Sequence, residues 1–347
     1  MSSESDGKKL GIGIIGLGMA SAPHARSLLD LSDRVEVIAA YSPTPTRRQS
    51  FAETYGLPVT DEIETIFADP RINAILILTP PNTHLELVQR AATARKHVLL
   101  EKPLDITPER AKALVETARD TGIRLGIVFQ NRFRPAALAL KDILGEGRLG
   151  RIVSTSMRLS NWRPQGYYDE PGRGTLARDG GGVLLTQAIH TIDLMVSLAG
   201  LPREVFAQAV TSPLHRMETE DLVAGTLIFG NGAIGTISAT TCAYPGFPER
   251  IEIIGTLGTA VLEGDTMRAA FLDGTSAHAG HADGGTGTGA DPMAFSHHLH
   301  RALISDFVEA IEEERSPIVT GEDALNAHRL IEALLQSSAT DLPQKVG

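Results

Sequence analysis

The first third of the chain alternates short apolar runs with amphipathic stretches. The apolar runs lie at 11–15, 35–41, 74–78, 97–100 and 124–128. One stretch between them carries clear helix signals, with Thr107 at the N-cap, Pro108 at the first helical position and Gly122 as the terminator. This alternation predicts a doubly wound parallel sheet, because parallel neighbours need a crossover that is usually a helix.

After about residue 130 the apolar runs become longer and the helical stretches fewer. Runs typical of β-strands lie at 151–161, 204–211, 222–229, 233–240, 250–254 and 258–263. The tight-turn sequence Gly230-Asn231-Gly232 separates two of these runs and predicts an antiparallel hairpin. We therefore expect an open, mostly antiparallel sheet in this part of the chain.

This change of pattern predicts two domains, one over residues 1–128 and one over residues 129–297. The chain ends in two amphipathic helical stretches over about 298–340, which are candidates to pack back on the first domain. Residues 276–290 are rich in Gly, Ala and Asp and have no apolar period. That composition predicts a mobile surface loop.

Charge narrows the class of partner. The chain has 347 residues, with 32 Lys and Arg against 42 Asp and Glu, and a formal net charge of −10. This charge argues against nucleic acid and anionic membranes as main partners, because both require clustered basic residues. The stretch 10–22 imitates a signal peptide, but its glycines fit another motif. No uninterrupted apolar run reaches the roughly 18 residues that a membrane helix needs.

Cysteine and histidine usage gives little sign of a metal site. Cys242 is the only cysteine, which excludes an internal disulfide, favours a cytoplasmic location and is interpreted as a buried structural thiol. His297, His298 and His300 suggest a metal cluster, but no acidic residue or cysteine is spaced to complete it. We therefore predict a surface helix there and no metal.

A glycine-rich loop follows the first apolar run and opens a helix, which is the context that a dinucleotide-binding loop requires. Gly16 permits the tight turn, Gly18 lets the backbone approach a pyrophosphate, and Ser21 is small enough for close helix packing. The helix N-terminus supplies N–H groups and a positive dipole end. The alternative is a turn without a ligand. The surrounding pattern favours a Rossmann domain whose loop, including Met19 and Ala20, binds a dinucleotide.

A charged pair follows a later apolar run. Glu101-Lys102-Pro103 comes directly after 97–100, near the end where open α/β sheets bind ligands. An ammonium group there can donate a hydrogen bond to a substrate hydroxyl and stabilise alkoxide character as hydride leaves the same carbon. The alternative is a surface Lys102 paired with Glu101.

These two motifs occur together with Thr79-Pro80-Pro81-Asn82-Thr83-His84. The combination resembles the glucose-fructose oxidoreductase, inositol dehydrogenase and MocA (Gfo/Idh/MocA) family, nearly end to end. Further matching segments are Tyr167-Tyr168, Gly180-Gly181-Gly182, His190 with Asp193, and Tyr244-Pro245-Gly246-Phe247.

The resemblance implies a Rossmann domain, an open antiparallel sheet domain, and Lys102 as the catalytic lysine at the nicotinamide. It also implies cofactor contacts from Thr79, Pro80, Asn82, His84 and Glu101. A homodimer or homotetramer is implied through the outer face of the second sheet, which would otherwise be an exposed apolar surface.

A second catalytic candidate lies on the apolar stretch after the three glycines. His190 follows Thr186 by four residues, so a regular helix places both on one face. The resemblance implies that His190 exchanges the hydroxyl proton, but Thr186 replaces the Asp that often orients this histidine. The sequence thus shows no carboxylate to favour the protonated ring. The alternative is a structural histidine.

The loop over 161–179 carries candidate substrate contacts. Arg donors and aromatic faces suit a polyhydroxylated ring or a carboxylate, and the loop holds Arg163, Tyr167, Tyr168 and Arg173. With Lys102, Thr186 and His190 they form the predicted substrate site. A solvated loop is the alternative. Related enzymes often have Trp where Gly172 stands, so the pocket departs from the family pattern here.

The end of the second strand bears on the choice of cofactor. A site selective for NAD usually has Asp or Glu there, and residues 39–48 contain neither. Ser42 and Thr44 can donate to a 2′-phosphate, which Arg47 or Arg48 can neutralise. We therefore predict that NADP is preferred and NAD possible; the alternative is a solvated arginine pair.

Together these features predict a cytoplasmic NAD(P)-dependent oxidoreductase that moves hydride between the nicotinamide and a sugar, sugar acid or cyclic polyol. Two alternatives on the same fold stay open: a nucleotide-sensing or binding protein, and an enzyme that shuttles hydride with a tightly bound cofactor. Retention of both Lys102 and His190 favours the enzyme, because a sensor needs neither.

Overall fold

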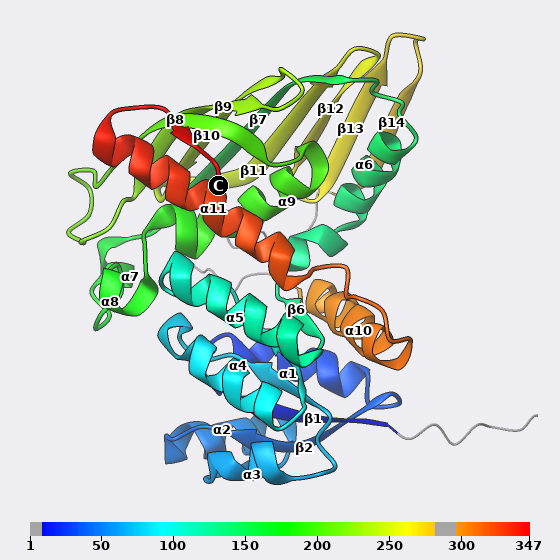
Figure 1. The fold of residues 1–347 in the computed structure, drawn as a ribbon, viewed down its shortest axis with the longest axis vertical. Helices are drawn as coiled ribbons and strands as arrows, with labels where there is room; N and C mark the ends of the chain where they lie inside the picture. Colours follow the sequence, from blue (N-terminus) through cyan, green and yellow to red (C-terminus); the bar gives the residue numbers. More distant parts are fainter. Residues whose placement is uncertain (1–8, 282–295) are drawn as a thin grey trace, which may run out of the picture. The chain divides into compact units, whose positions relative to one another are not determined.

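The computed structural model describes residues 9–281 and 296–347, which form two compact units (Figure 1). The first unit contains the described residues up to Asp105, together with Glu109–Val128 and His297–Gly321. The second contains Ile106–Pro108, the described part of Phe129–Ser296, and Glu322–Gly347. The chain thus returns to the first unit with one C-terminal helix and to the second with the other.

A six-stranded parallel sheet forms the centre of the first unit, in the order β3-β2-β1-β4-β5-β6. The strands are β1 (Leu10–Ile15), β2 (Val35–Tyr41), β3 (Val59–Thr60), β4 (Ala74–Ile77), β5 (His97–Leu100) and β6 (Leu125–Ile127). Every residue of β4 is buried, as expected for a parallel sheet covered on both faces. The predicted doubly wound sheet is confirmed.

Helices connect these strands. They are α1 (Ser21–Asp30), α2 (Pro45–Tyr55), α3 (Ile63–Ala68), the short η1 (Pro81–Thr83), α4 (His84–Thr93) and α5 (Pro108–Thr121). α5 begins at Pro108 and ends before Gly122, which has a φ of 73°, as its signals predicted. From the C-terminal part of the chain, α10 (His298–Glu312) packs against α1.

A nine-stranded sheet dominates the second unit, in the order β14-β13-β12-β11-β7-β10-β9-β8-β15. Its strands are β7 (Ile152–Trp162), β8 (Pro202–Val210), β9 (Leu222–Phe229), β10 (Ile234–Thr240), β11 (Cys242–Gly255), β12 (Gly258–Glu263), β13 (Thr266–Phe271), β14 (Ser276–Gly280) and β15 (Gln344–Lys345). Only β10 and β7 pair in parallel among these neighbours. The predicted mostly antiparallel sheet and the hairpin between β9 and β10 are confirmed.

Three helices cover one face of this sheet: α6 (Pro135–Gly145), α9 (Ile189–Ala199) and α11 (Gly321–Thr340) (Figure 1). The shorter helical segments are η2 (Gln130–Phe133), α7 (Gln165–Tyr168), α8 (Leu176–Asp179) and η3 (Leu184–Ala188). Among the described residues, the stretch Leu176–Ala199 is long and apolar enough to cross a membrane, yet most of it is buried inside the protein. A core helix of a globular unit has the same properties.

Three expectations about this unit need correction. Residues Ser276–Gly280 form β14 instead of a loop, while 282–290 of the expected loop lie outside the described residues. Cys242 is half-buried rather than buried. The outer face of the sheet is mixed rather than apolar, because Arg158 and Arg250 face each other across β7 and β11, and Arg250 pairs with Glu252 at 2.6 Å.

Candidate active site

The loop between β1 and α1 has the geometry that a pyrophosphate needs. Gly16 has a φ of 106°, and a Cβ built there would lie 2.7 Å from the carbonyl carbon of Leu78. Only glycine fits this position. A Cβ on Gly18 would meet nothing within 4 Å. The space beside Gly18 is therefore open to a ligand, and the loop fits the dinucleotide predicted from the sequence.

The N-terminus of α1 favours an anion. Ala20 at the N-cap position makes no side-chain hydrogen bond to the helix, and the first turn holds no acidic residue. Ser21 Oγ donates to the carbonyl oxygen of Gly18 at 2.7 Å, which fixes the end of the loop. Met19 is exposed beside it. The helix N–H groups and dipole thus remain directed toward a phosphate.

Three predicted segments follow three neighbouring strands. Gly16 follows β1, Thr79 comes after β4, and Lys102 comes after β5. The strand order reverses at β1, since β2 and β3 lie on one side of it and β4 lies on the other. Open α/β sheets bind ligands at the carboxyl ends of strands beside such a reversal. The fold therefore brings these segments to the edge where a nucleotide binds.

The loop after β5 is held from the interior. Glu101 is buried, and its Oε1 accepts a hydrogen bond from His24 Nε2 at 2.9 Å, while Oε2 accepts one from the Lys102 backbone N–H at 3.2 Å. Burial alone would raise the pKa of Glu101, but the hydrogen bond and the electrostatic attraction of His24, followed by the charge of Lys102, lower it to about 2. The ionised Glu101 is an interior group beside a half-buried Lys102.

His84 also supports this region from the interior. The side chain is fully buried, with Nε2 2.9 Å from the carbonyl oxygen of Thr79 and Nδ1 3.0 Å from that of Pro103. Burial lowers the pKa of His84 although these carbonyls favour its protonated form. The ring joins the loop after β4 to the loop after β5, which is a supporting position rather than a ligand-facing one. Of the other predicted contacts there, Pro80 and Asn82 are exposed and Thr79 is half-buried.

The two arginines at the loop between β2 and α2 differ in their contacts. Arg48 Nη1 donates to the carbonyl oxygen of Ser42 at 2.6 Å, so this guanidinium stabilises the loop itself. The Ser42 hydroxyl is buried and accepts a hydrogen bond from the Thr44 N–H at 3.3 Å. Arg47 is exposed. A ligand at this strand end would therefore meet Arg47 as the exposed cation.

In the second unit, the segment that carries His190 departs from a regular helix. Residues Leu184–Ala188 form a π-helical turn before α9 begins at Ile189. The four-residue spacing of Thr186 and His190 therefore does not guarantee a shared face, because that argument assumed an α-helix. The Thr186 hydroxyl donates to the carbonyl oxygen of Gly182 at 2.6 Å. His190 is half-buried, with its ring edge-on to Phe129 at 5.7 Å between centroids.

Tyr167 is the centre of the predicted substrate loop. Its hydroxyl oxygen accepts hydrogen bonds from Arg173 Nη1 at 2.9 Å and from Gln187 Nε2 at 3.4 Å. The Arg163 guanidinium lies 5.6 Å from the centre of its ring. Tyr168 is instead buried and bonds to Thr241 Oγ1 at 2.8 Å. The structure thus brings Arg163, Tyr167 and Arg173 together and adds Gln187, which the sequence analysis missed.

Buried carboxylates to which the sequence analysis assigned no role hold this part of the unit. Glu220 accepts hydrogen bonds from the backbone N–H groups of Gly182 and Leu184, both at 3.0 Å, and so fixes the glycine turn. Asp193, which had no assigned role, pairs with Arg132 at 2.5 Å, and burial raises the pKa of Asp193 to about 6. Partners 61 residues apart in the chain leave no local signal in the sequence.

His215 has a comparable supporting role. Its Nδ1 lies 2.7 Å from Asp221 Oδ2, and its Nε2 lies 2.9 Å from the backbone carbonyl oxygen of Arg163. Both residues of the pair are buried. The pair therefore anchors the backbone from which the Arg163 side chain extends.

The sequence pattern predicted that the histidines near residue 300 lie on the surface. This prediction is wrong for one of them. His297 pairs with Asp30 at 2.9 Å, but His300 is buried beside His24 and Glu101. A carboxylate and a second histidine thus reach His300 from distant segments, which spacing along the chain could not reveal.

Comparisons with known proteins identify the family. The model described as "Oxidoreductase family, NAD-binding Rossmann fold" matches residues 10–129, and the "GFO/IDH/MocA C-terminal domain" matches residues 137–261. The chain belongs to the Gfo/Idh/MocA oxidoreductase family. The predicted resemblance is confirmed, and so is the prediction that this Gfo/Idh/MocA protein is an oxidoreductase that uses a nicotinamide cofactor.

Relatives cover nearly the whole Gfo/Idh/MocA chain. Inositol 2-dehydrogenase from Rhizobium meliloti is 27% identical, over 94% of this chain and 96% of its own. A Bacillus subtilis relative named scyllo-inositol 2-dehydrogenase (NADP(+)) is 26% identical, over 94% and 93%. The crystal structure of levoglucosan dehydrogenase with NADH and levoglucosan has a TM-score of 0.86 and 25% identity, over 97% and 99%. Members of the family thus use NAD or NADP.

Proposed function

We propose that this protein interconverts a CH–OH group and a carbonyl on a sugar, sugar acid or cyclic polyol. The observation that carries the proposal is the Lys102 loop, held by an ionised Glu101 at the sheet edge beside the phosphate loop. The named substrates of the relatives, inositols and levoglucosan, support this substrate class.

Oxidation of the substrate hydroxyl releases one proton, which a side chain of the protein can accept. The bound nicotinamide accepts or supplies the hydride. In the oxidising direction, CH–OH and NAD(P)⁺ give a carbonyl, NAD(P)H and one proton. The ammonium group of Lys102, attracted to the ionised Glu101, donates a hydrogen bond to the substrate oxygen as negative charge develops there. We assign the released proton to His190.

The Tyr167 cluster suits the rest of a polyhydroxylated substrate. The guanidinium groups of Arg163 and Arg173 lie against the Tyr167 ring, and Tyr167 supplies both a hydroxyl and a ring face. Thr186 and Gln187 lie at the same turn, where Thr186 Oγ1 lies 2.5 Å from Gln187 Oε1. Several donors and acceptors around an aromatic ring favour hydroxyls over an apolar substrate.

NADP is the proposed preferred cofactor, with the exposed Arg47 as the group that meets the 2′-phosphate. Arg48, which bonds to the Ser42 carbonyl, shapes the loop instead. The measurement is the dissociation constant of NADPH and NADH for wild type, Arg47→Ala and Arg48→Ala. We expect tighter NADPH binding in wild type and a loss of about tenfold in Arg47→Ala, with NADH unchanged. Tighter NADH binding in wild type would leave NAD as the working cofactor.

A substrate screen tests the proposed reaction. Purified protein is mixed with NADP⁺ or NAD⁺ and a panel of inositols, aldoses, anhydrosugars and uronates, and cofactor reduction is followed by absorbance. We expect reduction with at least one cyclic polyol or sugar, and reduction slower by about 10² or more with Lys102→Met. Reduced nicotinamide already present in the purified protein would instead support hydride shuttling between two substrates.

Two further predictions accompany this function. We propose a cytoplasmic enzyme that associates as a homodimer or homotetramer through the outer face of the nine-stranded sheet. The mixed charges of that face, with Arg158 and Arg250 adjacent, would then pair with acidic groups of a second copy. Light scattering of wild type and Arg158→Glu tests the assembly, and a monomeric wild type would contradict it.

A further inference from the structure

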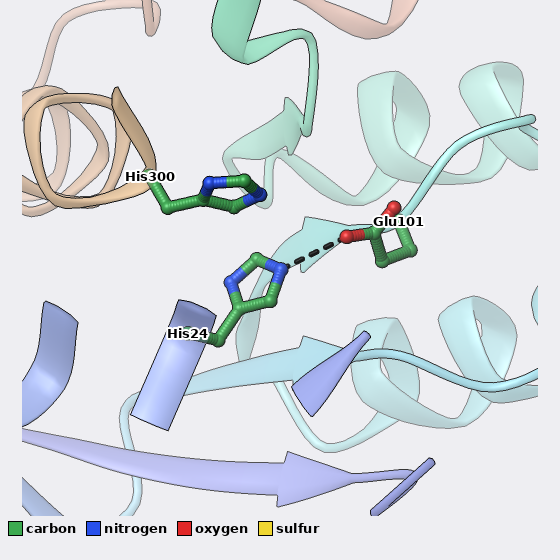
Figure 2. Close-up of side chains that lie close together, drawn as sticks. All are labelled: His24, Glu101 and His300. Carbon is green, nitrogen blue, oxygen red and sulfur yellow. Dashed lines mark hydrogen bonds and ion pairs between the residues drawn. The ribbon is translucent and has the colours of Figure 1, made fainter. Parts of the chain in front are cut away.

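Three titratable side chains converge inside the first unit (Figure 2). His24 comes from α1, Glu101 follows β5, and His300 comes from α10. All three are buried, and their nearest nitrogen and oxygen atoms lie within 4.8 Å of one another. The Lys102 loop thus rests on a cluster that the proposed reaction does not use directly.

The contacts favour hydrogen bonding over a metal ion in this cluster. Both Glu101 oxygens already accept hydrogen bonds, from His24 and from the Lys102 backbone. Only three possible metal ligands meet here within the described residues, whereas a structural zinc ion takes four ligands. His24 Nδ1 is buried without a hydrogen-bond partner, whereas the second nitrogen of a metal-bound histidine usually has one.

The direction of the central hydrogen bond follows from the charges. An ionised carboxylate only accepts, so His24 Nε2 carries the proton and donates to Glu101. The His300 ring stands edge-on to His24 at 5.0 Å, and burial lowers the pKa of His300 to about 3. His300 therefore packs against His24 as a neutral group.

We propose that His24 is a positioning residue for Lys102 and acts through Glu101. Its Nε2–H fixes one oxygen of Glu101, so that the other oxygen holds the Lys102 backbone and the carboxylate charge favours the ammonium form. This inference rests on the proposed function, in which Lys102 meets the substrate oxygen. Because His24 stands on α1, the helix whose N-terminus forms the phosphate loop also orients the catalytic loop.

A pair of substitutions separates donation from packing. His24→Gln keeps an amide donor near the position of Nε2, whereas His24→Met fills similar space without a donor. We expect kcat to fall about tenfold in His24→Met and less than about threefold in His24→Gln, with KM and cofactor affinity little changed. His24→Asn, whose shorter amide reaches only the position of Nδ1, should resemble His24→Met and serves if that variant does not fold. His328→Leu, a buried histidine of α11 in the second unit, is the control.

A second readout needs no substrate. Competitive acetylation of lysines across pH, mapped by mass spectrometry, reports how readily Lys102 loses its proton. Loss of the His24 donor should shift the Lys102 labelling midpoint down by on the order of half a pH unit or more, while His24→Gln and the control keep the wild-type midpoint. If the wild type oxidises no substrate but the variants without the donor still show this shift, the proposed function is refuted. The positioning of Lys102 by His24 would then still hold.

The proposal is overturned if His24→Met and His24→Gln have the same kcat and all variants share one labelling midpoint. Equimolar zinc in the purified wild type, lost from His24→Gln and His24→Met alike, would overturn it in favour of a metal site.

Discussion

The two units hold their functional side chains in different ways. In the first, the Lys102 loop is fixed by fully or largely buried groups, His24, His84 and Glu101, through backbone and carboxylate contacts. In the second, the side chains of Tyr167 and Arg173 hold each other on a half-exposed loop. Buried hydrogen bonds tolerate little displacement, while half-exposed arginine contacts contribute little stability and adjust easily.

This contrast assigns different tasks to the two units. A lysine on a loop held by buried groups suits the chemical step, which is common to every substrate of this class. An adjustable cluster suits recognition of hydroxyl patterns, which differ between substrates. Substitutions around the Lys102 loop should therefore act mainly on kcat, and those in the Tyr167 cluster mainly on KM.

The largest expected effect is that of Lys102→Met. Loss of the hydrogen-bond donor and of the charge should lower kcat by about 10² or more, because each such contribution is worth roughly that factor. Cofactor dissociation constants, measured by fluorescence titration, should stay within about threefold of wild type. Near-normal turnover in this variant would show that Lys102 does not take part in the chemical step, and the contrast between the two units would fail.

His328→Leu should change the pH dependence of stability without affecting the reaction. Burial lowers the pKa of His328 to about 4 from 6.5. Between these values the unfolded chain binds the proton that the folded chain excludes, so the free energy of unfolding falls as pH drops. From pH 7 to 5 wild type should lose about 2 kcal/mol more than His328→Leu, as measured by urea unfolding. Equal losses would mean that His328 is protonated in the folded state.

His190→Asn should lower kcat by about tenfold, less than loss of Lys102, because solvent can accept the released proton in place of the imidazole. Rates are compared by stopped flow at several pH values, and circular dichroism verifies the fold. If the variant unfolds at lower temperature but turns over normally while folded, His190 has a structural role.

Tyr167→Phe should have the smallest effect, a rise in KM of about threefold with kcat nearly unchanged. It removes the hydroxyl that Arg173 and Gln187 share and keeps the ring. Steady-state kinetics with the best substrate of the screen gives both constants. A fall in kcat with constant KM would show that the Tyr167 cluster acts in the chemical step, and the contrast between the units would fail.

Local patterns predicted the fold and the backbone-based part of the site. Gly16 and Gly18 can be recognised in the sequence because the phosphate loop contacts its ligand through backbone groups, which require glycine at these positions. The strand that precedes Lys102 can be recognised because it is a continuous apolar run. His24 and Glu220 were missed because their partners are 77 residues away in the first case and 36 and 38 in the second. The π-helical turn at Thr186 was also missed, since its apolar pattern fits an α-helix equally well.

The central claim is that hydride moves between a hydroxyl-bearing carbon of the substrate and the nicotinamide. The most direct measurement uses the best substrate of the screen with deuterium on its hydroxyl-bearing carbons, followed by mass spectrometry of the recovered cofactor. We predict one deuterium per reduced nicotinamide formed by wild type, and no such product with Lys102→Met within the same time. Reduced cofactor without deuterium, or no reduction by any polyol or sugar while the nucleotide still binds, would contradict the account.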